Sequence, residues 1–113
     1  RVFPTGATRD TDTTKPDYTG FLSALVKHEF GEYMHKHRFQ SNGMIRDADN
    51  WKKGIPEMEY VRSLDRHLTD VELVYEGFPR LAREDLETAL CAILFNVQGL
   101  LFEVLRREGG GVS

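Results

Sequence analysis

The sequence predicts an all-α fold: a small bundle of three main helices with an extended N-terminal arm, which we expect oligomerisation to complete. Apolar residues recur with a helical period in three segments, and no segment shows convincing strand alternation or an internal repeat. A chain of 113 residues can build one core. We therefore expect a single domain, with residues 1–19 as an arm, 20–107 as a helical core and 108–113 as a frayed tail.

Composition indicates an ordinary soluble chain. Charged residues make up 29% and the net charge is -3, which gives no general attraction to nucleic acid or to anionic lipid. The single cysteine, Cys91, excludes an intrachain disulfide and favours a cytoplasmic location. The apolar run at 89–102 is interrupted by Asn96, Gln98 and Gly99, so we expect neither a membrane span nor, at the N-terminus, a signal peptide.

The first 18 residues are rich in Thr, Asp, Gly and Pro and have no regular period. They form either an ordered arm or a solvated flexible tail. Arg9, Asp10, Lys15 and Asp17 place four charges close together in it.

Residues 20–37 have the pattern of one amphipathic helix. Its polar face carries His28, Glu32 and His35 at helical spacing, with Glu29 beside them. These side chains are neighbours on a helix, so they form either a set of metal ligands or bases, or a solvated face. The expected buried face consists of Phe21, Leu22, Leu25, Val26, Phe30, Tyr33 and Met34.

Residues 38–50 have turn composition and are expected to lie over a ligand, with Arg46 available to an anion. Trp51 is interpreted as a core anchor in preference to a stacking platform. Pro56 then begins a second helix that extends to residue 75. Arg66, His67 and Asp70 lie at the edge of its apolar face, where Arg66 and Asp70 could instead pair with each other. The expected buried set is Met58 or Tyr60, with Val61, Leu64, Leu68, Val71 and Val74.

The third helix is expected over residues 83–107, with acidic residues at its start and Arg106 and Arg107 at its end. Its apolar arc is wide, which predicts a central helix that also reaches a subunit interface. A row of small or polar residues permits close approach of another helix or a ligand. In that row, which comprises Thr88, Ala92, Asn96 and Gly99, the asparagine is either a satisfied buried amide or a ligand contact.

Several ordered motifs resemble a phage-encoded family. They are GATRD at 6–10, KPDY at 15–18, YMHKHR at 33–38, DNWKKGIP at 49–56, SLDRHLTD at 63–70 and LCAILFN at 90–96. The chain is similar to the dATP/dGTP diphosphohydrolase N-terminal domain family, whose members resemble all-helical MazG-like nucleotide pyrophosphohydrolases. The resemblance implies hydrolysis of a purine deoxynucleoside triphosphate to monophosphate and pyrophosphate, with Mg²⁺ or Mn²⁺, in an infected bacterial cytoplasm.

On this hypothesis carboxylates hold the metal and cations neutralise phosphate charge. We expect His67 and Asp70 to be catalytic. The expected metal ligands are Glu29, Glu32, Asp70 and Glu87. The expected substrate contacts are Arg9, Lys15, Tyr18, Asn50, Trp51, Lys53, Arg66 and Asn96.

Two other functions fit the same residues. In one, the chain holds a nucleotide or nucleotide-derived signal without turnover, as a sponge against host defence would. In the other, it is a structural phage oligomer that binds neither metal nor nucleotide.

Overall fold

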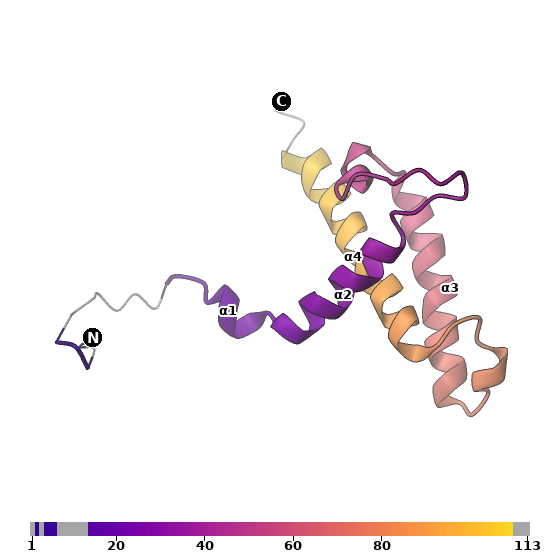
Figure 1. The fold of residues 1–113 in the computed structure, drawn as a ribbon, viewed down its shortest axis with the longest axis horizontal. Coiled ribbons are helices and arrows are strands. Elements are labelled where there is room, and N and C mark those ends of the chain that lie inside the picture. The colour runs from indigo at the N-terminus through magenta and orange to yellow at the C-terminus, as the bar shows by residue number, and fades with distance from the viewer. Residues whose placement is uncertain (1, 3, 7–13, 110–113) are drawn as a thin grey trace.

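The computed structural model describes residues 2, 4–6 and 14–109, and this part of the chain is all-α (Figure 1). Its strand-like pairing is limited to isolated bridges such as Phe39 with Ile45. The predicted fold class, with three main helices, is therefore confirmed. The helices are α1 (Tyr18–Phe21), α2 (Ala24–Lys36), α3 (Glu57–Tyr75) and α4 (Leu86–Gly109), with two short 3-10 helices, η1 (Asn50–Lys53) and η2 (Pro79–Leu81).

The single helix predicted over 20–37 is divided into α1 and α2. Leu22 has extended backbone angles, and the Ser23 hydroxyl accepts a hydrogen bond from the Val26 amide at 3.2 Å. A serine in this position satisfies an amide at the start of a helix, so it favours a new helix over continuation of the old one. The apolar period passes through this break and does not reveal it.

The other two helix predictions are confirmed to within a few residues. Helix α3 follows Pro56, carries Glu57 and Glu59 in its first turn, and is followed by Gly77 at φ +93°. Both the acidic first turn and the glycine suit helix ends. At the start of α4, Asp85 Oδ1 accepts from the Thr88 amide at 2.8 Å.

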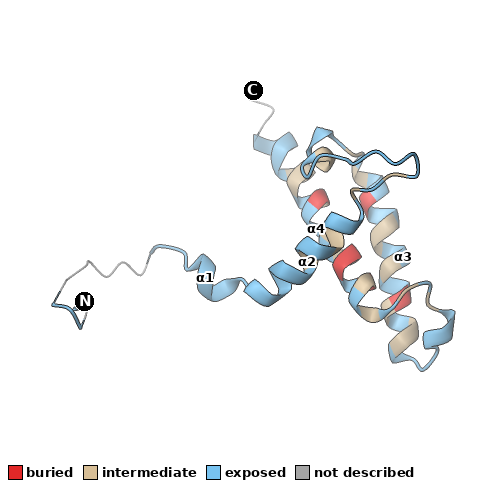
Figure 2. Ribbon diagram, in the orientation of Figure 1, coloured by how far each residue is buried: buried red, intermediate tan, exposed pale blue. Residues whose placement is uncertain are grey.

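Helices α3 and α4 run side by side in opposite directions and enclose the core (Figures 1 and 2). Tyr60 of α3 is 2% exposed, and its ring lies directly against Gly99 of α4. The ring centroid is 5.9 Å from that of Phe95. The predicted row of small residues on α4 therefore admits a neighbouring helix, because only a residue without a side chain leaves room for this ring.

Asn96 is a satisfied buried amide, the first of the two roles considered for it. It is 3% exposed, and Nδ2 donates to the Ala92 carbonyl at 2.7 Å within α4. A buried amide with a hydrogen-bond partner avoids the cost of an unpaired polar group.

Several residues expected in the core are instead exposed. The apolar residues before the middle of α2 project from the α3–α4 pair, and Met58, Val61 and Leu68 of α3 also face outward. Within this chain α2 contacts α4, and its half-buried apolar side chains, Phe30, Tyr33 and Met34, are all in its C-terminal half. No described helix of this chain covers the N-terminal half of α2. The exposed apolar residues of this half and of the segment just before it are Phe21, Leu22, Leu25 and Val26.

Helix α4 is 24 residues long and is apolar enough to cross a membrane by length and composition. Length and composition are weak support for a span, however, because the core helix of a soluble protein passes the same test.

We predict that Gly99→Ala destabilises the fold. A Cβ at this position would lie 2.3 Å from Tyr60 Cε1, so the ring or the helix must move, at a cost of about 1 to 3 kcal/mol. Urea denaturation followed by circular dichroism measures the loss. Gly31→Ala is the matched control, since no atom lies within 4 Å of the added Cβ and alanine favours a helix interior. Equal stabilities for the two variants would contradict the role given to the Tyr60–Gly99 contact.

Candidate functional site

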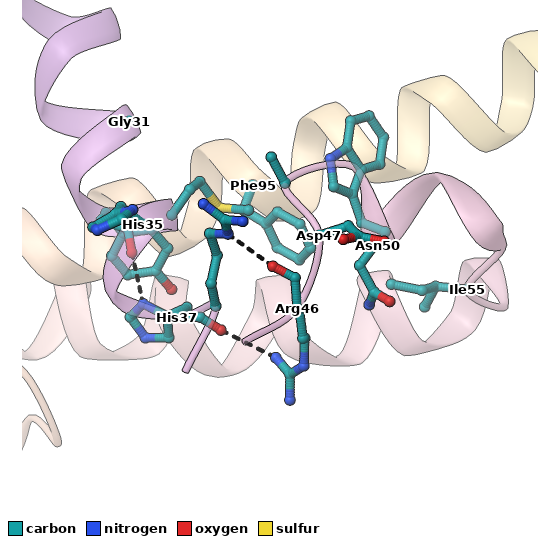
Figure 3. Close-up of a pocket in the computed structure, with 13 residues that line it drawn as sticks. Gly31, His35, His37, Arg46, Asp47, Asn50, Ile55 and Phe95 are labelled. Atoms are coloured by element: carbon teal, nitrogen blue, oxygen red, sulfur yellow. Dashed lines mark hydrogen bonds between the residues drawn. The ribbon is translucent and has the colours of Figure 1, made fainter. Parts of the chain in front are cut away.

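Two hollows adjoin α2, and the larger of these lies between its C-terminal half, the loop that follows it, η1 and α4 (Figure 3). Its volume of about 560 Å³ is within the range of small-molecule sites. Figure 3 shows His35 and His37 on one side and Asn50 and Ile55 on the other, with Phe95 between them. The cavity, which we call the aromatic hollow, is lined by Gly31, Tyr33, Met34, His35, His37, Arg38, Arg46, Asp47, Ala48, Asn50, Trp51, Ile55 and Phe95.

Two arginines shape the loop wall of the aromatic hollow. Arg38 Nε donates to the Arg46 carbonyl at 2.7 Å, and Arg46 Nη1 donates to the His37 carbonyl at 3.1 Å (Figure 3). Gly43, at φ +83°, allows the turn between them. Each guanidinium has five N–H donors and uses one in these bonds, so both retain donors for an anion. The expectation that Arg46 is available to an anion fits this geometry.

Trp51 anchors η1 on α4, as expected of a core anchor. Its indole packs edge to face on Phe102 of α4, with centroids 5.0 Å apart, and it also lines the aromatic hollow. Arg106 of α4 donates to the Lys52 carbonyl at 3.1 Å. These contacts fix η1 on α4, so the tryptophan wall has a defined position.

The smaller hollow, which we call the acidic hollow, lies between α2 and the start of α4 and has a volume of about 300 Å³. Three of the four predicted metal carboxylates line it, Glu29 and Glu32 from α2 and Glu87 from α4. It shares two residues with the aromatic hollow, so the two cavities adjoin. The full lining is Glu29, Glu32, Tyr33, Lys36, His37, Asp85, Glu87, Thr88 and Cys91.

Burial, hydrogen bonds and nearby charges shift the pKa values of three groups that line the acidic hollow. Burial raises the pKa of the Cys91 thiol, and the charges of Glu29, Glu87 and Asp85 raise it further. The pKa of Tyr33 is also raised, by burial and then by Glu84 and Cys91. Hydrogen bonds from Thr88 lower the pKa of Asp85, so this carboxyl is ionised at neutral pH. The four carboxylates of this lining, Glu29, Glu32, Asp85 and Glu87, offer oxygen ligands of the kind that Mg²⁺ and Mn²⁺ prefer.

The fourth predicted metal ligand, Asp70, does not line the acidic hollow. It is 3% exposed and accepts hydrogen bonds from the Arg83 backbone amide at 3.1 Å, from Nε at 3.0 Å and from Nη2 at 2.7 Å. These bonds, above all those from the guanidinium, lower the pKa of Asp70. Its partner is therefore Arg83 of the segment before α4, and the alternative pairing with Arg66 is wrong.

His67 lies beside Asp70 and is hydrogen bonded through Nδ1 to Glu84. In the described part of the chain, His67, Asp70 and Glu84 are the one group of three such side chains whose ligand atoms lie within 4.8 Å of one another. Because Arg83 already pairs with Asp70, the cluster is part of a hydrogen-bonded network that ties α3 to the segment preceding α4.

The other predicted substrate contacts are dispersed. Asn50 and Trp51 line the aromatic hollow, whereas Lys53 and Arg66 are exposed and line neither hollow. Lys15 and Tyr18 belong to the segment that precedes α2, and Asn96 is buried between the helices. Arg9 lies outside the described residues.

Several lining residues were not predicted. Tyr33 and His37, shared by both hollows, are four residues apart on and just after α2, a spacing that could have linked them to Glu29. Asp85 was interpreted only as a helix-start residue. Phe95 and Arg38 carry no local signal, because their place in the hollow depends on how α2 and α4 pack.

Comparison of the chain with protein-family models, with curated proteins and with solved structures finds no significant match.

We predict that Asp70→Asn removes a pH-dependent part of the stability. The folded pKa of Asp70 is below its unfolded value, so its ionised form stabilises the fold above about pH 4, and this contribution is lost as pH falls through the folded pKa. Near pH 7 the variant loses about 1.5 to 3 kcal/mol of unfolding free energy, since charge-assisted hydrogen bonds are removed.

Urea denaturation of both proteins at pH 7 and pH 3 tests this prediction. The difference between wild type and variant should shrink at pH 3. A difference of the same size at both pH values would contradict the assignment.

Proposed function

We propose that this chain is a metal-dependent nucleotide pyrophosphohydrolase that converts a purine deoxynucleoside triphosphate to its monophosphate and pyrophosphate. The observation that carries the proposal is the adjoining pair of hollows. One is aromatic and apolar with arginines on its wall, and the other is lined by carboxylates. A nucleotide has the same two parts, an apolar base and a charged triphosphate. The resemblance to phage dATP/dGTP diphosphohydrolases and MazG-like proteins points to the same substrate class.

The base and sugar fit the aromatic hollow. Trp51, Tyr33 and Phe95 supply flat apolar surface there, and a nucleobase stacks on such surfaces with about 1 to 3 kcal/mol per contact. Asn50 adds an amide that can both donate to and accept from a base edge. The volume of about 560 Å³ accommodates a nucleoside.

The triphosphate extends from there toward the acidic hollow. Arg38 and Arg46 offer donors on the way, and Lys36 lies within the acidic hollow itself. Without a cation, four carboxylates would repel a triphosphate. The proposal therefore requires a divalent metal between the carboxylates and the triphosphate.

Glu29, Glu32, Asp85 and Glu87 are the residues that would hold Mg²⁺ or Mn²⁺. When bound, the metal supplies Lewis-acid stabilisation of phosphate charge and lowers the pKa of a coordinated water. In the net reaction, a water oxygen becomes bonded to the α-phosphorus, and the bond from that phosphorus to the α,β-bridging oxygen breaks. Pyrophosphate leaves. A proton released from the water can be taken by His37, which borders both hollows.

His67 and Asp70 become positioning residues in this proposal. Asp70 holds Arg83, and His67 holds Glu84, one residue before Asp85. Together these contacts fix the position at which α4 begins. They thereby fix the positions of Asp85 and Glu87 opposite α2.

One observation favours a binding protein without turnover as the second candidate. In the described residues, the carboxylates of the acidic hollow do not converge within 4.8 Å as His67, Asp70 and Glu84 do. A chain whose carboxylates are separated in this way would bind nucleotide through the aromatic hollow alone.

We predict that the protein releases dGMP or dAMP and pyrophosphate when incubated with dGTP or dATP and Mg²⁺ or Mn²⁺, as measured by ion-exchange chromatography. Glu29→Gln combined with Glu32→Gln should lower the rate at least about 100-fold, since loss of groups around a bound metal costs 10- to 100-fold even beyond the direct ligands.

The matched control is Glu72→Gln combined with Glu76→Gln, which removes the same charge from exposed positions that line neither hollow. It should retain the wild-type rate. Absence of monophosphate with every purine nucleotide and metal would overturn the hydrolase proposal, and recovery of intact bound nucleotide would support the second candidate.

Because Trp51 is the only tryptophan, its fluorescence reports on the aromatic hollow. We predict quenching by dGTP and by deoxyguanosine. Arg46→Gln should raise the Kd about tenfold for dGTP, because a charged contact to phosphate contributes roughly one factor of ten, and should leave the Kd for deoxyguanosine unchanged. An equal loss for both ligands would contradict the placement of phosphate beside Arg46.

A further inference from the structure

The aromatic hollow contains a carboxylate that the proposed reaction does not use. Among the described residues that line this hollow, Asp47 is the one that carries a carboxylate, and it does not line the acidic hollow. Its side chain makes no hydrogen bond or ion pair within the described part of the chain. A carboxylate accepts hydrogen bonds and donates none, so its donors must come from water or from a bound ligand.

Asp47 lies in the part of the aromatic hollow away from the acidic hollow. The two hollows share Tyr33 and His37, and Figure 3 shows His37 on one side of the cavity and Asp47 with Asn50 on the other. The backbone amide of Asn50 donates to the Asp47 carbonyl at 3.1 Å, so both side chains project from one tight turn. A triphosphate that extends toward the acidic hollow therefore leaves the base beside Asp47.

Charge favours the same orientation of the nucleotide. Phosphate oxygens are negative and accept hydrogen bonds, as the Asp47 carboxylate does, so phosphate and carboxylate repel each other. A nucleobase, in contrast, carries N–H donors on its edge. The base edge is therefore the part of the ligand that can satisfy Asp47.

We propose that Asp47 selects guanine over adenine when the aromatic hollow holds the base, as it does in the proposed function on which this inference rests. Guanine has two neighbouring donors, N1–H and the 2-amino group, which match the two oxygens of a carboxylate. Adenine has its 6-amino donor between two acceptors, N1 and N7. A carboxylate that accepts from this amino group brings its second oxygen against a nitrogen lone pair.

The neighbouring groups of the aromatic hollow hold a purine without selecting between the two. The Asn50 amide has both a donor and an acceptor, so it can pair with O6 of guanine or with the 6-amino group of adenine. Stacking on Trp51 and Phe95 tolerates every base, because each base has a flat π-face. Selectivity in this hollow therefore depends on Asp47.

Titration of Trp51 fluorescence with nucleosides tests the inference without metal, phosphate or turnover. Wild type should bind deoxyguanosine with a Kd at least about tenfold below that for deoxyadenosine, since a bidentate pair discriminates between bases by about this factor or more. Deoxyinosine keeps N1–H and lacks the 2-amino group, so its Kd should lie between the other two.

Asp47→Asn should reduce the ratio of the two Kd values to about one or below. An amide in place of the carboxylate offers one donor and one acceptor, the pair that suits adenine. Asp49→Asn is the matched control, because it removes the same charge from an exposed residue of the same loop that lines neither hollow and makes no capping bond to η1. The control should keep the wild-type ratio.

Equal Kd values for the two purine nucleosides in wild type, or an unchanged ratio in Asp47→Asn, would overturn the assignment of Asp47. A mixed reaction with dGTP and dATP separates this outcome from failure of the hydrolase proposal. Equal kcat/KM for the two nucleotides would overturn base selection and leave the hydrolase proposal in place. Selective binding of deoxyguanosine without release of any monophosphate would support base selection and overturn hydrolysis.

Discussion

The ring of Tyr60 against the bare backbone of Gly99 is the contact on which the rest of the structure depends. It brings α3 close to α4 and buries the tyrosine almost completely in a chain whose other buried apolar residues in the described part are small: Ala89, Cys91 and Ala92. This contact fixes the two helices, and so gives Phe95 a defined place in the wall of the aromatic hollow. The start of α4 likewise has a defined place, where Asp85 and Glu87 line the acidic hollow. The Asp70–Arg83 pair then secures the connection between the two helices.

Features that depend on local spacing could be predicted from the sequence. The three main helices, the small-residue row with Gly99, and the position of Glu29 and Glu32 on the same side of α2 all follow from helical period. Features that depend on distant partners could not. The i,i+4 rule allowed Arg66 as a partner for Asp70, but the fold brings Arg83 to it with both guanidinium and backbone donors. Likewise the apolar period marks Phe21 and Leu25 as buried, whereas the structure leaves both exposed.

The central claim is that nucleotide and metal bind together between α2 and α4, and thermal unfolding measures this most directly. A ligand that binds only the folded state raises the melting temperature in proportion to its affinity and concentration. With dGTP or dATP, the increase should be larger in the presence of Mn²⁺ than the sum of the increases with nucleotide and metal alone, and Glu29→Gln combined with Glu32→Gln should remove this surplus. An unchanged melting temperature with every combination of purine nucleotide and metal would contradict the account.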